Sequence, residues 1–411
     1  MKNQIITSLD LGTSHVRIAV GQKDENDPNK VQIIGLVEVP TQGISKGMIT
    51  SIEDTVSSIT SALERIEKIT GFPASDVVVG ISGSHITSQL GKGVIAVSKV
   101  NGEIEEDDVS RAIETARSVS LPPNKEILHI IPKSFIVDGQ GNIKDPIGMT
   151  GIRLEVETMV IHGANSQIKN LTKCVYRTGL NIEDLIYSAL GASEAVLSNR
   201  QKELGAAVVD IGAATTNLAV YEGGELIHAA VLPIGSDHIT SDIALGLRID
   251  LDTAEKIKIK DGCAMSSDVD KNDEINLSDY GEDNAQVSRK YLYKIIEARV
   301  EEIFEKVNAE LKKIEKAGML PAGAVLTGGG AKLKGIVEQA KKQLRLPARL
   351  GTIEKASSVL DKAYDPSFFT SIGLIIWGNQ MLGKEAEKSF EMKNLKEGMK
   401  KLIKWLKSLK P

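Results

Sequence analysis

Short apolar runs and one amphipathic stretch alternate along the first eighty residues. The apolar runs predict strands over residues 5–20, 31–39 and 77–81. Between the last two runs, apolar side chains recur at helical spacing over residues 51–70 and predict an amphipathic helix. The N-terminal region is therefore expected to mix strands with a helix that has one apolar face.

The pattern changes over residues 82–162. A helix with acidic residues in its first turn is predicted at residues 105–119. Three strands are predicted at residues 94–97, 127–137 and 153–162. Together they form a compact α+β insertion of about 80 residues within the first half. We find no catalytic constellation in it, so an interaction module is expected.

Strand and helix patterns alternate again after the insertion. Helices are expected at residues 167–178 and 194–199, with a strand at 182–187. A second half begins at Gly205, with a strand at 225–234 and helices at 236–247, 251–260 and 286–316. The polar and acidic residues 262–284 predict a surface loop.

One stretch of the first half returns two hundred residues later. Residues 10–20 and 210–220 each follow a short apolar strand, pass through a turn of small residues and enter a second strand. The shared positions are Asp10 and Asp210, Gly12 and Gly212, Ala19 and Ala219, and Val20 and Val220. A repeat at this separation indicates two similar halves, because solenoid repeats have much shorter periods.

The two turns have a composition that suits phosphate. Glycine lets the backbone approach a ligand closely. The hydroxyls of Thr13, Ser14, Thr215 and Thr216, with exposed backbone N–H groups, can hold phosphate oxygens. Asp10 and Asp210 end their strands, where each can hold a metal-bound water. A single copy would read as an ordinary β-hairpin, but two copies in register favour the phosphate interpretation.

A third glycine-rich turn follows another predicted strand at residues 324–327. Gly328, Gly329 and Gly330 would lead into a helix starting near Ala331, so the backbone could lie against a base or a phosphate. It is not a P-loop, because no Gly-Lys-Ser/Thr follows. It is not a dinucleotide fingerprint either, because Leu333 stands at the position of the last glycine.

Composition limits the classes of function. The chain has 411 residues and a net charge of −5, and only 4% of its residues are aromatic, which argues against nucleic-acid binding. Cys174 and Cys263 make no metal-ligand spacing and indicate a reducing compartment. We see no signal-peptide core and no run of 18 apolar residues, so a cytoplasmic location is expected.

The last residues differ in charge from the rest. Residues 383–392 are polar and predict a linker. Residues 393–411 hold seven lysines and one glutamate, so this tail carries +6 and the remainder of the chain −11. As a helix, the tail would gather Leu395, Met399, Leu402, Ile403, Leu406 and Leu409 on one face, with Trp405 at its edge and Lys396, Lys400, Lys401, Lys404 and Lys407 opposite.

A basic amphipathic helix with an interfacial tryptophan is typical of segments that lie on anionic membranes. It carries too many lysines to span a bilayer. Two alternatives remain open, namely docking of its apolar face on the protein's own body and binding to a calmodulin-like partner.

These features together resemble the actin/Hsp70/sugar-kinase superfamily and, more narrowly, the FtsA family of bacterial division proteins that anchor FtsZ. The resemblance covers essentially the whole chain. Its specific marks are residues 81–85 (Ile-Ser-Gly-Ser-His), 205–212, 254–258 (Ala-Glu-Lys-Ile-Lys) and the basic tail. It implies an α/β, actin-like (ribonuclease-H-like) two-domain ATPase fold with an α+β insertion subdomain and a C-terminal amphipathic helix.

The resemblance also implies a division into subdomains. The first core subdomain would comprise residues 1–81 and 163–198, and the insertion residues 82–162. The second core subdomain would comprise residues 199–229 and 303–382, with a small subdomain at 230–302. The linker at 383–392 and the membrane-targeting helix at 393–411 would follow.

Site residues follow from the same resemblance. Asp10 and Asp210 would orient Mg²⁺ through water, and Gly12, Thr13, Ser14, Gly212, Thr215 and Thr216 would hold the phosphates of ATP. Glu255, Lys256 and Lys260 would lie at the ribose, and Gly328, Gly329, Gly330 and Leu333 at the adenine. Ala213 and Ala214 stand where relatives often have glycine, which favours slow or absent hydrolysis. Glu194 is the nearest candidate for positioning a water.

The function that the resemblance implies is an ATP-binding, self-polymerising adaptor. It would tether FtsZ filaments to the cytoplasmic face of the membrane at the division septum and recruit later division proteins through residues 82–162. The subdomain at 230–302 would receive the FtsZ C-terminal peptide through Arg289, Lys290 and Arg299. The alternatives are an FtsA-like scaffold of pilus assembly and a small-molecule kinase of the same fold.

Overall fold

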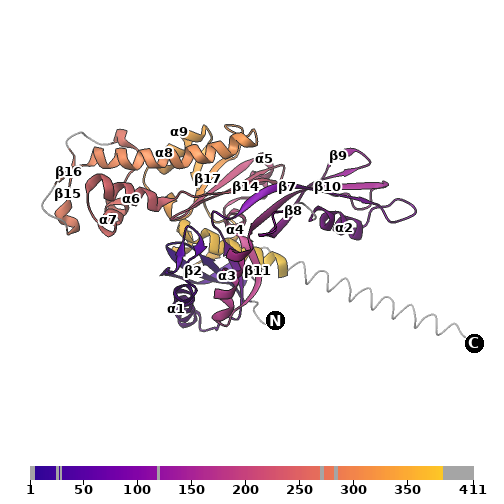
Figure 1. Ribbon diagram of the computed structural model, residues 1–411, viewed down its shortest axis with the longest axis horizontal. Helices are drawn as coiled ribbons and strands as arrows, with labels where there is room; N and C mark the ends of the chain where they lie inside the picture. Colours follow the sequence, from indigo (N-terminus) through magenta and orange to yellow (C-terminus); the bar gives the residue numbers. More distant parts are fainter. Residues whose placement is uncertain are drawn as a thin grey trace, which may run out of the picture.

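The computed structural model describes residues 5–382 except 25–26, 28–29, 118–120, 269–272 and 282–285. The predicted linker at 383–392 and the basic tail at 393–411 lie outside the described residues. Two core sheets lie at the centre of the molecule, and the insertion and the segment containing α6 to α8 project from them in opposite directions (Figure 1). Among the described helices, none is both long enough and apolar enough to cross a membrane.

The first half is built on a six-stranded sheet with the order β11-β6-β1-β2-β3-β19. Its strands are β1 (Ile5–Leu11), β2 (His15–Lys23), β3 (Val31–Pro40), β6 (Asp76–Ile81), β11 (Asn181–Tyr187) and β19 (Ala356–Ser358). The strands β1, β2 and β3 form an antiparallel meander, whereas β6 pairs parallel to β1 and β11 pairs parallel to β6. A short hairpin joins β4 (Ile44–Ser45) to β5 (Met48–Ile49).

The second half repeats this arrangement in the order β14-β13-β12-β17-β18. Its strands are β12 (Ala206–Ile211), β13 (Thr216–Glu222), β14 (Glu225–Leu232), β17 (Gly323–Thr327) and β18 (Ala348–Leu350). Again an antiparallel meander is followed by two parallel strands. The prediction of two similar halves is confirmed, and the fold is actin-like.

The two repeated turns have the same register. Asp10 is paired with Arg17 across the first hairpin, and Asp210 is paired with Asn217 across the second. In each turn the glycine N–H donates to the carbonyl three residues later, at 3.1 Å from Gly12 and at 2.9 Å from Gly212. The sequence repeat is therefore a repeat of structure down to single hydrogen bonds.

Helices cover both sheets. In the first half, α1 (Ile52–Thr70) packs on β2 and β3 and against α3 (Asn165–Arg177). Alternate residues of β12 face two cores, because Ala206 and Val208 pack towards the first half and Val209 packs among residues of α8 (Arg289–Lys313) and α9 (Ile336–Leu344). The second half also contains α5 (Asn199–Leu204), α6 (Ser236–Leu247) and α7 (Leu251–Asp261).

The helix α4 (Ser188–Val196) lies between the two sheets and contacts β6 and β11 on one side and β12 and β13 on the other. Eight of its nine residues are buried. The sequence pattern predicts a helix only at 194–199, so the prediction places the start of this helix six residues too late. The reason is physical, because a helix that is apolar all round has no amphipathic period.

The insertion forms a separate four-stranded sheet in the order β7-β10-β8-β9. Its elements are β7 (Thr87–Ala96), α2 (Glu106–Ala116), β8 (Lys125–Val137), β9 (Gln140–Ile143) and β10 (Arg153–Ala164). The helix α2 packs on this sheet over a small core that includes Ile104, Phe135 and Leu154. The α+β character predicted for the insertion is confirmed.

Two local expectations are wrong. The glycine turn at 328–330 leads into a single 3₁₀ turn at Gly329–Lys332, and α9 begins only at Ile336, because Leu333 is extended and Gly335 is left-handed at φ 78°. The region expected as a loop at 262–284 contains strand β15 (Glu274–Asn276), which pairs with β16 (Gln286–Ser288).

Candidate functional site

A cleft between the two halves is lined by the ends of β1, β12 and β17 and by the start of α4. It gathers nine of the predicted site residues, which are Asp10, Gly12, Thr13, Ser14, Asp210, Gly212, Thr215, Gly328 and Gly329. Residues that were not predicted also line it, among them Arg17, Gly47, Ser82, Ser188 and Asn217. The two repeated turns therefore face a common space, as their sequence suggested.

Three of the residues predicted at the phosphates and the adenine do not line this cleft. The Thr216 hydroxyl is buried and donates to the Ile234 carbonyl at 2.8 Å. Gly330 packs on Ile211, where an added Cβ would lie 2.5 Å from the Ile211 side chain. Leu333 packs against the core of the second half. In the described structure these three residues support the turns rather than face the cleft.

Uncompensated negative charge is unfavourable on the two cleft carboxylates, Asp10 and Asp210. Burial raises the pKa of Asp10 to about 6, with the nearby Asp210 adding to the rise and the Arg17 guanidinium opposing it. Burial also raises the pKa of Asp210, although a hydrogen bond from Asn217 opposes that rise. A hydrated divalent cation would favour the ionised forms, and carboxylate oxygens are its usual ligands, so this pair fits Mg²⁺.

Glycine is required where the turns approach these carboxylates. Gly328 has a φ of 85°, and an added Cβ would lie 2.5 Å from Asp210 Oδ1. An added Cβ at Gly12 would lie 2.8 Å from the His15 carbonyl oxygen. Because only glycine leaves these positions open, a ligand can approach the backbone of the turns closely, which fits the phosphates of a nucleotide.

A hydrogen-bonded chain crosses the cleft and was missed by sequence reasoning. Ser82 Oγ donates to Asn217 Oδ1 at 2.6 Å, and Asn217 Nδ2 donates to Asp210 Oδ2 at 3.0 Å. Ser82 ends the first-half part of the chain just before the insertion, whereas Asn217 belongs to β13. A signal for Asn217 was present, because it holds the position that Arg17 holds in the other hairpin.

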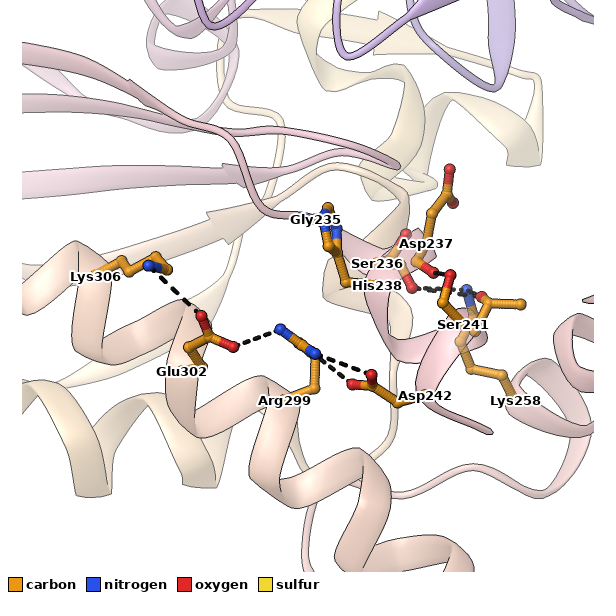
Figure 2. Close-up of polar contacts among 11 residues, drawn as sticks. Gly235, Ser236, Asp237, His238, Ser241, Asp242, Lys258, Arg299, Glu302 and Lys306 are labelled. Carbon is orange, nitrogen blue, oxygen red and sulfur yellow. Dashed lines mark hydrogen bonds and ion pairs between the residues drawn. The ribbon is translucent and has the colours of Figure 1, made fainter. Parts of the chain in front are cut away.

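The start of α6 is bonded to the second repeated turn. The N–H groups of Ser236 and Asp237 donate to the carbonyls of Gly212 and Ala213 at 2.9 and 2.8 Å. Figure 2 shows this start of α6 beside the Lys258 side chain of α7, whose Nζ donates to the Ser236 carbonyl at 3.3 Å. The turn, α6 and α7 therefore form one connected unit.

Of the three residues expected at the ribose, Glu255 lies on a different face of α7 from Lys256 and Lys260. Glu255 accepts from the Thr240 hydroxyl and pairs with Lys258 Nζ at 2.6 Å. Lys256 and Lys260 are exposed, and Lys260 Nζ lies 5.0 Å from the centre of the Tyr280 ring. Lys258, which sequence reasoning missed, is the buried lysine on the face of Glu255, and the three-residue spacing was the available signal.

Glu194 lies outside the cleft lining, where it anchors two ion pairs. Its carboxylate contacts Lys202 Nζ and, at 2.9 Å, Lys355 Nζ, and it accepts from Gln380 Nε2 at 3.0 Å. Burial opposes ionisation of Glu194, but the two ammonium groups outweigh it and lower the pKa to about 2. This geometry gives no support to a water-positioning role.

Two of the three cations proposed for FtsZ are engaged within the protein. Arg299 forms a two-pronged pair with Asp242, at 2.6 and 2.9 Å, and also contacts Glu302 (Figure 2). Arg289 pairs with Asp261 at 2.7 Å and with Asp273 at 3.0 Å. For Lys290, half-buried at the start of α8, no ion pair is found among the described residues.

Comparison with known proteins assigns the chain to a family. A family model described as cell division protein FtsA matches residues 207–373, and one described as the SHS2 domain inserted in FtsA matches residues 83–162. Cell division protein FtsA of Pseudomonas aeruginosa is 34% identical over 378 residues, covering 92% of this chain and 90% of the relative. That of Bacillus subtilis is 39% identical over 374 residues, covering 91% and 83%.

Solved structures agree at the level of the fold. A chain of the PilM–PilN type IV pilus biogenesis complex matches with a TM-score of 0.64 at 17% identity, covering 91% of this chain and 98% of the other. MreB5 of Spiroplasma citri bound to ADP matches with a TM-score of 0.53 at 15% identity, covering 94% and 98%. With curated relatives aligned over nine tenths of its length and both family models matching, the chain belongs to the FtsA family of cell division proteins.

Proposed function

We propose that this protein binds ATP and Mg²⁺ between its halves and acts as a polymerising adaptor that tethers FtsZ filaments to the cytoplasmic face of the membrane at the septum. One observation carries the nucleotide part. Two equivalent hairpins bring Asp10 and Asp210 to a single cleft, where Asp210 is buried, Asp10 is half-buried and both carboxyl groups have raised pKa values. A bound cation with its phosphates would favour the ionised forms of both carboxyl groups.

Each part of the nucleotide has residues that suit it. Asp10 and Asp210 would hold Mg²⁺ through water, and the turns at 12–14 and 212–215 would bind phosphate oxygens through N–H and hydroxyl groups. The base would lie by Gly328 and Gly329, and Glu255 would face the ribose. MgATP supplies the phosphoanhydride that can be cleaved. Ala213 lines the cleft where a smaller residue would leave more room, which favours slow or absent hydrolysis.

Nucleotide binding is tested by titrating the protein with MgATP and MgADP in a calorimeter. We expect Asp210→Ala to abolish measurable binding, because it removes a carboxylate from the cation site. Glu103→Ala is a matched control, since Glu103 is an exposed carboxylate of the insertion. Unchanged affinity in Asp210→Ala would refute the site.

The FtsZ C-terminal peptide is proposed to bind the segment at 230–302. Large apolar side chains are exposed there, including Leu245 on α6 and Tyr291 on α8. The Tyr291 hydroxyl lies 3.8 Å from the point where a Cβ on Gly246 would sit, so Tyr291 of α8 packs beside the end of α6 that carries Leu245. Lys290 precedes Tyr291 and is the cation best placed for an acidic peptide, because Arg289 and Arg299 would first have to leave their carboxylate partners.

A labelled FtsZ C-terminal peptide tests this surface by fluorescence anisotropy. We expect Lys290→Glu to weaken binding by about fivefold, which corresponds to about 1 kcal/mol for the loss of one exposed ion pair. Leu245→Asp should weaken it further by placing a charge in the apolar patch. Lys312→Glu, at the other end of α8, is the charge-matched control. Equal affinity in all three variants would place the peptide elsewhere.

The membrane part rests on the basic tail, and the division role of the family agrees with it. The insertion at 82–162 is proposed to receive later division proteins.

A pilus-assembly scaffold remains the alternative that shares this fold, as the similarity to PilM illustrates. Failure of the FtsZ peptide to bind at high micromolar concentration would favour that alternative. A small-molecule kinase has less support, because Asp10 and Asp210 are the only acidic residues in the described cleft lining.

A further inference from the structure

A cavity of about 440 Å³ lies where the insertion meets the second half. One wall consists of β7, β8 and β10 of the insertion, and the other of β14 and the end of α8 (Figure 1). Ser88 Oγ on β7 donates to the Ala229 carbonyl on β14 at 2.5 Å and so ties the two walls together. The volume lies within the range of roughly 300–1,000 Å³ that is typical of small-molecule sites.

Lys133 enters the wall of this cavity at a β-bulge. Glu157 of β10 pairs with Ser134 of β8. The next residue of β10, Thr158, pairs with Pro132, so Lys133 is an extra residue of β8 without an opposite partner. Proline has no N–H to donate to the ladder, which favours an irregularity here, and a bulge redirects the side chain of its extra residue. The bulge therefore gives the cavity a half-buried lysine.

The other two lysines of the cavity wall already have counter-ions. Lys316 Nζ pairs with Glu222 at 2.7 Å, and Lys313 Nζ pairs with Glu310 at 2.6 Å. Lys133, by contrast, makes neither an ion pair nor a hydrogen bond within the part of the chain that the structure describes. The lysines and carboxylates of the cavity therefore leave one positive charge uncompensated, which favours a ligand with a single negative charge.

A second donor of the cavity wall is unsatisfied. Gln89 lines the cavity from β7, and its Nε2 is nearly inaccessible to solvent and finds no acceptor in the described structure. Since buried polar atoms are nearly always paired, this amide indicates a missing acceptor. Much of the remaining lining is apolar and includes Leu90, Met159, Ile227 and Ile314. Leu90 is 65% exposed, so an apolar ligand group could cover it.

We propose that this cavity binds a small amphiphilic carboxylate. Its head group accepts hydrogen bonds from Lys133 and Gln89, and its hydrocarbon part covers Leu90. A carboxylate carries one negative charge and matches the one uncompensated lysine, whereas a phosphate monoester carries about −1.5 to −2. Because the walls belong to the insertion and to the second half, the bound ligand holds the insertion in place. The proposal is independent of nucleotide binding, since no described residue lines both this cavity and the cleft.

Calorimetric titration of the full chain with octanoate tests the site, and octylamine serves as the probe of equal length and opposite charge. Wild-type protein should bind octanoate and not octylamine, because Lys133 repels an ammonium group. Lys133→Gln should weaken octanoate binding by on the order of tenfold, the scale for losing a hydrogen bond between charged groups. Lys133→Arg keeps the charge and should retain binding.

The control variant is Lys68→Gln, which removes an exposed lysine at the end of α1 and should leave octanoate binding unchanged. Any binding of octanoate to the basic tail is the same in every variant, so it cancels in the comparison. Leu90→Asp is a second test on an exposed side chain, where the fold should tolerate the change. It should abolish binding by placing a carboxylate beside the head group.

Thermal unfolding supplies a readout that a purely structural role would not change. Octanoate should raise the unfolding temperature of wild-type protein and of Lys68→Gln, but not that of Lys133→Gln. Without ligand, Lys133→Gln should unfold at the wild-type temperature, because no ion pair is lost. Octanoate affinity that is unchanged in both Lys133→Gln and Leu90→Asp, or octylamine binding equal to that of octanoate, would overturn the proposal.

Discussion

Ser82 Oγ donates to Asn217 Oδ1 at 2.6 Å, joining the end of β6 in the first half to β13 in the second. Asn217 passes the contact on to Asp210 through its Nδ2 at 3.0 Å. The orientation of one cleft carboxylate therefore depends on a residue at the entrance to the insertion. These two hydrogen bonds connect the entrance of the insertion to the candidate cation site.

Asn217→Ala should weaken MgATP binding by about tenfold, because it leaves Asp210 without the donor that orients it and holds its pKa down. Ser82→Ala should have a smaller effect, since Asn217 can still donate to Asp210. Titration of both single variants and of the double variant measures their coupling. Strictly additive losses would mean that the two residues act independently.

The pH dependence of stability should reveal Asp10. Its pKa is raised from 3.8 to about 6, so the ligand-free folded protein binds more protons than the unfolded chain between these values. Stability from this group is therefore present below pH 3.8 and is lost as the pH rises through 6. Asp10→Asn should remove this loss and stabilise the ligand-free protein at pH 7 by on the order of 1–3 kcal/mol.

Denaturant unfolding of wild-type and Asp10→Asn protein at pH 4, 5, 6 and 7 checks this expectation. MgATP should bind wild-type protein less well as the pH falls below 6, since protonation of Asp10 opposes the cation. An identical pH slope for the two proteins would contradict the assignment.

Glu194→Gln should destabilise the fold by about 3–5 kcal/mol, because it leaves the ammonium groups of Lys202 and Lys355 without their buried counter-charge. The pKa of Glu194 is lowered from 4.5 to about 2, so its stabilising contribution is present above pH 4.5 and is lost as the pH falls through 2. Chemical denaturation measures both effects. A variant of normal stability with altered hydrolysis would restore the water-positioning hypothesis.

The basic tail should decide membrane binding. Deleting residues 393–411, or replacing Leu402 and Trp405 by Glu, is expected to abolish flotation with anionic liposomes, because either change removes the apolar face. Lys404→Glu with Lys407→Glu should weaken flotation on anionic vesicles by removing about 1 kcal/mol per lysine. Glu385→Gln in the predicted linker is the control. Lipid binding by the tail-deleted protein would refute the anchor.

Much of the local structure follows from the sequence alone. The two hairpins at Asp10 and Asp210 are short-range structures, and their paired strands, glycine turns and shared register are encoded within a dozen residues each. The helix at 51–70 is also predictable from the sequence, because one face is buried and apolar while the other is exposed. Such periodic patterns record burial along a single element.

Contacts between distant segments were decided only by the tertiary structure. Ser82, Ser188 and Asn217 meet at the cleft although more than a hundred residues separate the first from the other two. The start of α4 escaped prediction because the helix is buried on every side, so no polar face marked it. Glu194, which looked available for chemistry, is occupied by lysines from two other segments. A sequence pattern records which face of an element is buried, but the partner of a side chain is set by how the two halves pack.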